Sequence, residues 1–146
     1  VYGAVACFAA RHASNEALKQ FSRDVELFAK ATAEGRDSFH LVDIAYRAGT
    51  DLGLCCGSTL AADVLRRLGR IAYLQHRFLL PVPPRWRQQS VARFRKLEAA
   101  LLSRSEARSE AAGRKLVQHT QTLLVLHATS SQSAAVEPKK AKEKKV

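Results

Sequence analysis

The spacing of the apolar residues constrains the fold of this chain more than any other sequence feature. Leu18, Phe21, Val25 and Phe28 follow one another at steps of three or four residues, and the same spacing recurs in later segments. That spacing places side chains on one face of an α-helix, whereas a half-buried strand alternates every second residue. The sequence shows no alternation of useful length. We therefore predict an all-α fold, a small irregular bundle of five to six helices.

Capping residues, glycines and prolines set the expected helix boundaries. Ser14 and Ser58 are suited to cap helices, and Gly35, Gly49 and Gly113 are suited to end them. A proline segment at 81–84 must interrupt the chain because proline lacks an N–H donor and restricts the residue before it. The predicted helices are Val1–Ala13, Ser14–Gly35, Ser38–Ala48, Ser58–Leu80, a helix that starts near Arg85 or Ser90 and ends at Gly113, and Arg114–Ala128, with a loop at Asp51–Gly57.

Two alternatives stay open in this scheme. Gly69 lies inside the fourth predicted helix and would bend or divide it. The apolar run Leu123–Leu126 also fits a short strand. The fourth helix carries a long apolar stripe that we expect to face the core, formed by Leu60, Val64, Leu65, Leu68, Ala72 and Leu79.

The length of 146 residues suits one domain. We assign residues 1–129 to a single helical domain. Residues 130–146 begin with a Ser-rich linker and continue with a Lys-rich segment that has almost no apolar side chains to bury. We expect this tail to be disordered unless a partner binds it.

Positive charge is concentrated after residue 50. The chain carries 24 Lys and Arg against 13 Asp and Glu, a formal net charge of +11. Residues 1–50 hold six basic and six acidic residues, residues 51–100 hold nine and three, and residues 101–146 hold nine and four. An excess of this size indicates an acidic partner, which is nucleic acid, an anionic membrane or an acidic protein.

No acid occurs between Asp63 and Glu98, and eight of the nine Lys and Arg residues in that interval are arginine. Arginine forks bind phosphate and stack on bases, so this bias favours RNA or DNA. A solvated basic face or an acidic protein partner is the alternative. The candidate nucleic-acid-binding residues are Arg66, Arg67, Arg70, Arg77, Arg85, Trp86, Arg87, Arg93, Arg95 and Lys96, together with Lys139, Lys140, Lys142, Lys144 and Lys145 of the tail.

Trp86 belongs to this set because it stands between two arginines beside the proline segment. Aromatic side chains stack on unpaired bases while arginines hold the backbone. We expect Trp86 to be partly exposed, and Phe78 and Phe94 to pack in the core. Trp86 is equally suited to anchor a protein interface.

The sequence carries no pattern typical of an active site or a metal centre. Gly53–Thr59 precedes a helix, but a phosphate-binding loop needs four residues between its glycines and a Lys after the second. Cys55 and Cys56 are adjacent, whereas zinc ligands are spaced by two or more residues. No histidine pair or serine stands in a catalytic motif. We expect a non-catalytic protein without cofactor, metal or small-molecule substrate.

Cysteine content and the first residue bear on location. Three cysteines rule out a small disulfide-stapled scaffold and fit a reducing compartment. The chain begins at Val1, as it would after removal of an organellar leader, or as a fragment would. We expect a mitochondrial location on this basis. No apolar run is long enough to span a bilayer, and the apolar faces are needed for a core, so we do not expect membrane binding.

Two segments resemble parts of known families. Asp37–Gly49 resembles one helix of the organellar RNA-binding helical repeats, although the pattern does not recur at a fixed period. Val1–Lys30 is similar to the helical start of the oligomycin-sensitivity subunit of ATP synthases in its Tyr2-Gly3 pair and its Ala/Leu pattern, and the rest of the chain does not follow it. Neither match assigns the chain to a family.

These observations predict a structural component of a large ribonucleoprotein, an organellar ribosome above all. The Arg-rich segment and the Lys-rich tail would neutralise rRNA phosphates. Residues 1–50, which carry no net charge, would contact neighbouring proteins. The alternative is an accessory helical subunit of a mitochondrial membrane complex, a respiratory complex or ATP synthase, that acts through protein contacts.

Overall fold

The computed structural model describes the backbone of residues 1–78 and 82–135 and the side chains of residues 1–75 and 82–126. Those ranges contain six α-helices and no strand, so the all-α prediction is confirmed. The predicted phosphate contacts of Arg77 and of Lys139–Lys145 lie outside the described side chains. The helices are α1 (Tyr2–His12), α2 (Asn15–Ala33), α3 (Ser38–Leu54), α4 (Thr59–Phe78), α5 (Pro84–Leu102) and α6 (Glu106–Ala135).

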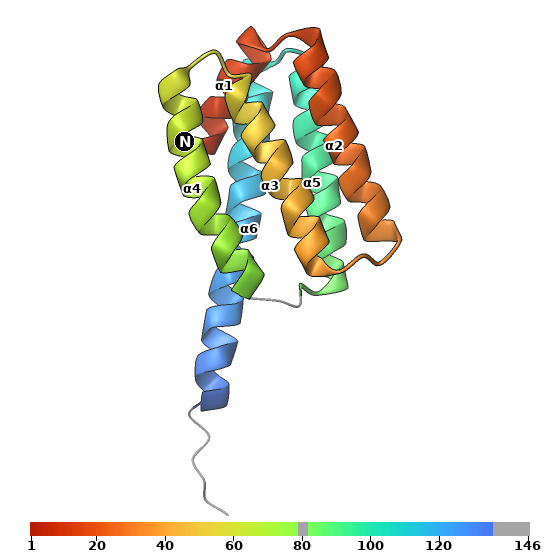
Figure 1. Ribbon diagram of the computed structural model, residues 1–146, viewed down its shortest axis with the longest axis vertical. Helices are drawn as coiled ribbons and strands as arrows, with labels where there is room; N and C mark the ends of the chain where they lie inside the picture. Colours follow the sequence, from red (N-terminus) through yellow and green to blue (C-terminus); the bar gives the residue numbers. More distant parts are fainter. Residues whose placement is uncertain (79–81, 136–146) are drawn as a thin grey trace, which may run out of the picture.

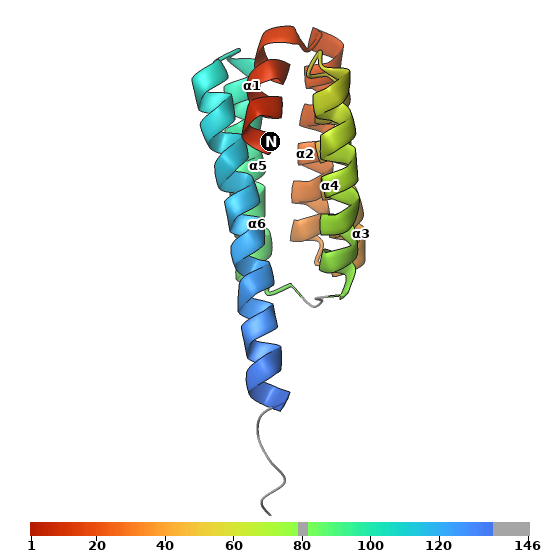
Figure 2. The same cartoon turned by 90° about the vertical axis from the view of Figure 1, so that its left-hand side faces the viewer.

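The helices pack side by side as a bundle, with α2, α3 and α5 each in contact with two or more others (Figure 1). α2 packs against both α3 and α5. In addition, α3 contacts α4, and α5 contacts α6. The short helix α1 lies mainly on α6 and fills one end of the bundle between α6 and α4 (Figure 2). The C-terminal part of α6 extends past the other end of the bundle (Figure 1). α4 is an edge helix, since it packs mainly on α3.

Two glycines allow α1 and α6 to approach closely. A Cβ on Gly3 would lie 2.6 Å from Cγ of Arg114 and 3.0 Å from the backbone oxygen of Glu110. A Cβ on Gly113 would lie 3.1 Å from Cβ of Ala6 and 3.3 Å from Cα of Gly3. All four distances are shorter than ordinary contacts of a Cβ atom, so the close crossing depends on residues without a side chain.

The predicted helix starts are largely confirmed by side-chain caps. Ser14 Oγ accepts a hydrogen bond from the backbone N–H of Ala17 (3.1 Å), and Ser58 Oγ accepts one from Ala61 (3.2 Å). Each satisfies a donor that the first turn of a helix leaves free. Gly35 adopts a φ of +68° just after α2, which confirms that it ends this helix.

The predicted end of the third helix is wrong. α3 continues through Gly49 to Leu54, so half of the predicted loop is helical. The extension buries Leu52, of which 2 % is exposed. A buried leucine stabilises by about 2 kcal/mol, which offsets the cost of about 1 kcal/mol for each of the two glycines, Gly49 and Gly53, that the extension takes into the helix.

The boundary between the last two helices is also wrong. The chain turns at Ser103–Ser105, where Arg104 has a φ of +54°, and Gly113 lies inside α6. The Arg104 guanidinium donates to the carbonyl of Ala13 and to Oδ1 of Asn15 (2.8 Å), which ties this turn to the α1–α2 connection. The glycine serves the crossing with α1 rather than a helix end.

α6 then runs without interruption to Ala135. The apolar run Leu123–Leu126 is therefore helical, and the strand alternative is wrong. The predicted linker at Ser130–Ser133 is also part of α6. No glycine or proline occurs between Arg114 and Glu137, so nothing in that segment forces the helix to stop.

The apolar stripe of α4 is only partly buried. Leu65 packs in the core with 9 % of its surface exposed, but Leu60 and Leu68 are 75 % and 47 % exposed. Gly69 does not divide the helix. Its missing side chain makes room for Tyr46 of α3, since a Cβ would lie 3.2 Å from Cε2 of that ring. The expectation that the whole stripe faces the core is wrong.

Candidate nucleic-acid interface

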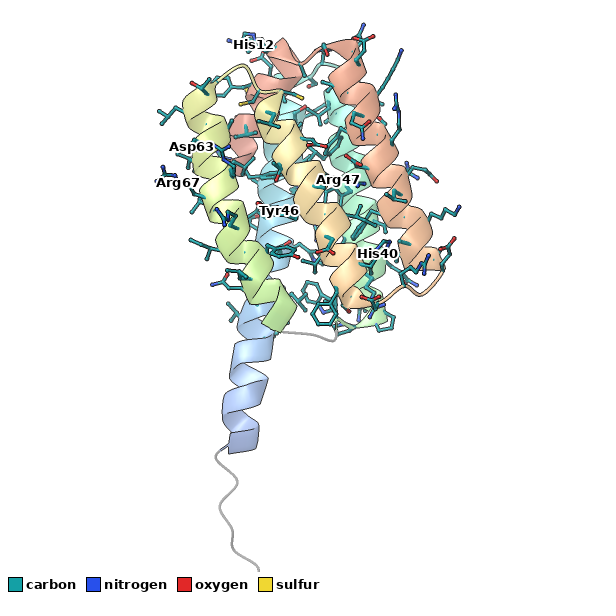
Figure 3. The ribbon with its side chains drawn as sticks, viewed as in Figure 1. His12, His40, Tyr46, Arg47, Asp63 and Arg67 are labelled. Carbon is teal, nitrogen blue, oxygen red and sulfur yellow. The ribbon has the colours of Figure 1, made fainter. Side chains whose placement is uncertain are left out.

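The first predicted cations lie on the outer side of α4. Arg66 and Arg67 both pair with Asp63, and the distance from Arg67 Nε to Asp63 Oδ2 is 3.0 Å. The hydrogen bond from Arg66 and the charge of Arg67 hold the pKa of Asp63 below its usual value. Asp63 and Arg67 point away from α3 (Figure 3). One carboxylate thus faces two exposed cations, which leaves net positive charge there.

Arg70 follows on the same helix beside a shallow pocket. The pocket is lined by Arg70, Tyr73 and Leu74 of α4 and by Asp43 and Tyr46 of α3. Tyr73 donates to Asp43 Oδ1 (2.7 Å), and the two tyrosine rings lie 5.1 Å apart. Asp43 repels phosphate, so Arg70 is the group in this pocket that suits an anion. Sequence reasoning missed Tyr46 and Asp43, which no spacing links to α4.

Arg87 forms hydrogen bonds within the protein. Its guanidinium donates to the carbonyls of Val82 (2.9 Å) and Arg36 (3.0 Å) and to Oγ of Ser38 (3.0 Å). The bonds to Arg36 and Ser38 fix the start of α5 to the start of α3. Few of its donors remain for a phosphate.

Arg95 is similarly engaged with carboxylates. It pairs with Glu26 of α2, and its Nη1 lies 3.2 Å from Oε2 of Glu98 on its own helix. The hydrogen bonds that Arg95 donates to Glu26 and Glu98 raise the pKa of its guanidinium. The pair with Glu26 connects α2 with α5. The phosphate contacts predicted for Arg87 and Arg95 stay predictions, and both side chains have structural roles.

Trp86 and His119 form a stacked pair where α5 meets α6. Their ring centroids are 4.3 Å apart at an interplanar angle of 29°. His119 Nε2 lies 3.2 Å from Oγ of Ser90 and 3.4 Å from the carbonyl of Trp86. Burial lowers the pKa of His119, and the charge of Arg93 lowers it further, against the opposing effect of the Trp86 hydrogen bond. The histidine covers one face of the indole, so a base could stack only on the other face.

Trp86 is half-buried, as expected, and Phe94 is buried, which confirms its predicted place in the core. Phe94 packs on Phe28 of α2 with ring centroids 5.1 Å apart. Arg93 lies on the α5 side that carries Trp86 and Ser90. Its Nε is buried and has no hydrogen-bond partner among the described residues.

Arg85 and Lys96 are exposed on α5 and form no ion pair within the described part of the chain. They stand eleven residues apart, about three turns, so they lie on one face about 16 Å from each other. Arg108 and Lys115 of α6 are also exposed, also unpaired among the described side chains, and two turns apart. Sequence reasoning did not place these two in the site, although their seven-residue spacing would have indicated a shared face.

Every acid of α5 and α6 is already paired. Glu98 binds Arg95, Glu106 binds Arg11 of α1, and Glu110 binds Arg114. The two helices pack side by side, so their remaining exposed cations have no unpaired carboxylate on either helix within the described residues. This arrangement suits an external polyanion. The predicted cations do not form one patch, since α4 packs mainly on α3 whereas α5 packs on α2 and α6.

The structure also brings together two carboxylates that the sequence did not link. Asp24 of α2 is buried, and its Oδ1 lies 3.0 Å from Nη2 of Arg47 on α3. Burial raises the pKa of Asp51, and the charge of Asp24 raises it further. The three residues form an internal charge cluster between α2 and α3.

The described residues hold no cluster of three or more potential metal ligands. None of the helices in the described ranges has the length and hydrophobicity needed to cross a bilayer. The sequence matches no protein-family model, and comparisons with curated proteins and with solved structures give no match.

Proposed function

We propose that this protein is a non-catalytic RNA-binding component of a large ribonucleoprotein, and specifically of a mitochondrial ribosome. The observation that carries the proposal is the set of exposed cations on α5 and α6 whose neighbouring acids are all paired internally. Cations that already neutralise carboxylates contribute little to binding phosphate, whereas unpaired ones release counterions when phosphate binds.

The division of charge between helices supports this proposal. Residues 1–58 carry six basic and seven acidic residues, whereas residues 84–126 carry nine basic and three acidic. Arg85, Lys96, Arg108 and Lys115 would contact phosphates, and Arg70 would add a contact on α4. Such contacts position a protein on RNA without reading its sequence. The protein would therefore act as a structural element rather than as a sequence-specific regulator.

A salt titration tests the proposal. Binding of the full chain to a single-stranded RNA oligonucleotide is measured by fluorescence anisotropy over a series of KCl concentrations. The variant Arg85→Gln/Lys96→Gln removes two cations of α5, and Lys19→Gln/Arg23→Gln removes an Arg and a Lys that are exposed on the neutral helix α2. Each lost phosphate contact should reduce the slope of log K against log salt by about 0.7, so the first variant should lose about 1.4.

The control variant should leave the slope unchanged. Binding that does not respond to salt in the unaltered protein would refute phosphate contact. Equal reductions of the salt slope in the two variants would show that net charge alone, rather than the α5 face, determines binding. The absence of RNA binding by the unaltered protein would favour the alternative role in protein contacts.

A further inference from the structure

α4 has more apolar surface than the bundle covers. Leu65 faces the core, while Leu60, Leu68, Ile71 and Leu74 are 75 %, 47 %, 55 % and 54 % exposed. Together with the half-buried Val64 they follow steps of three and four residues, so they form one continuous face, here called the outer apolar face. It extends about 21 Å from Leu60 to Leu74. Four exposed aliphatic side chains on one helix face are typical of an interaction site.

A cation lies in the middle of this face. Arg67 stands seven residues after Leu60 and seven before Leu74, two helical turns from each, so it lies in line with both. Its side chain is 79 % exposed even with Nε bonded to Asp63. Arg66 and Arg70 flank the face on one side. A partner that covers the leucines must therefore also accommodate positive charge.

We propose that the outer apolar face of α4 binds an acidic amphipathic helix of a partner protein. The spacing of the leucines and isoleucine matches a helix packed along α4, with apolar side chains in a seam of about four turns. A Glu or Asp at the middle of that helix would pair with Arg67, and acids along one edge would face Arg66 and Arg70. This surface does not depend on RNA binding by α5 and α6.

Two other occupants fit less well. A second copy of this chain packed antiparallel about the midpoint of the face would place Arg67 against Arg67, which repels. A lipid surface would have to accept the Arg67 guanidinium among buried leucines, where an isolated charge is costly. An acidic helix turns the same residue into an attractive contact.

Two synthetic peptides provide the test. Both are amphipathic helices of about 15 residues with the same leucine seam, one carrying Glu and the other Lys at the central and flanking positions. Binding to the full chain is measured by fluorescence anisotropy at moderate salt. We expect the Glu peptide to bind at least about tenfold more tightly than the Lys peptide, and Arg67→Glu to reverse that order.

Leu68→Gln/Ile71→Gln should weaken the Glu peptide about 30-fold, because each side chain has roughly half of its surface left to bury. Leu27→Gln/Leu102→Gln changes two exposed leucines on other helices and should leave binding unchanged. Unchanged far-ultraviolet circular dichroism verifies that the variants fold. Because Arg67→Glu removes no apolar contact, it tests the proposal even if the double variant fails to fold.

Several outcomes would overturn the proposal. The first is the absence of binding by the Glu peptide, and the second is equal affinity for the two peptides. The third is an equal loss of affinity in Leu68→Gln/Ile71→Gln and in the control Leu27→Gln/Leu102→Gln. Sedimentation that shows self-association lost in Leu68→Gln/Ile71→Gln would assign the face to a second copy. Binding to phosphatidylserine vesicles lost in the same variant would assign it to a lipid surface.

Discussion

Replacing Gly113 by alanine tests whether α1 and α6 approach each other as closely as the structure shows. In an unconstrained helix interior, alanine is more stable than glycine by about 1 kcal/mol because it restricts the unfolded chain. At Gly113 the new methyl group would lie 3.1 Å from Cβ of Ala6 and 3.3 Å from Cα of Gly3. The second contact is with backbone, so α1 as a whole must move away from α6.

Overpacking of this kind costs about 1–3 kcal/mol. Against a gain of about 1 kcal/mol from helix propensity, we expect Gly113→Ala to lower the free energy of unfolding by about 1 kcal/mol. In a domain of this size that change lowers Tm by about 2–4 °C. The loss of stability should be accompanied by weaker packing of α1, because α1 packs mainly on α6.

Gly49 of α3 provides the matched control. It is also a glycine inside a helix, but its Cβ would meet Tyr2 at 3.7 Å, an ordinary van der Waals distance. Gly49→Ala should therefore raise the free energy of unfolding by up to about 1 kcal/mol. Guanidinium unfolding monitored by circular dichroism measures both variants. The reasoning is refuted if both glycine variants stabilise the protein, since the α1–α6 crossing would then have room for a methyl group.

Two further predictions concern the internal polar contacts. Arg87→Ala should lower the free energy of unfolding by about 2–3 kcal/mol in denaturant titrations, because it removes one hydrogen bond to Val82 and two to the start of α3. Arg85→Ala should change it by less than about 0.5 kcal/mol. Similar losses in the two variants would contradict the structural role of Arg87. Asp51→Asn should stabilise the protein increasingly as pH rises through the raised pKa of Asp51, because the folded state disfavours the ionised form. Stability curves of variant and unaltered protein that stay parallel across pH would contradict this.

Local sequence signals predicted the helices well where a cap or stop acts on its own backbone. Ser14 and Ser58 cap α2 and α4, and Gly35 adopts the positive φ that ends α2. These signals act within one turn of the helix, so neighbouring residues are enough to recognise them.

Signals that depend on another helix were misjudged. Gly49 and Gly113 look like helix ends in sequence, yet both lie inside helices that extend further than expected. The burial of Leu52 carries α3 past Gly49, and the approach of α1 explains Gly113. A glycine needed for close packing and a glycine needed for a turn cannot be distinguished from sequence, because the difference is the presence of a neighbour.

In the candidate interface, too, some properties follow from the sequence alone and others depend on tertiary contacts. The sequence alone determined the all-α class, the neutral first part and the acid-free arginine interval, since these depend on residue type and spacing. Only the tertiary structure decided which cations are available. Arg87 and Arg95 bind groups on α3 and α2, while Arg85 and Lys96 stay unpaired among the described residues. The physical reason is that an ion pair needs a partner within about 4 Å, and Arg95 and Glu26 are 69 positions apart in the chain.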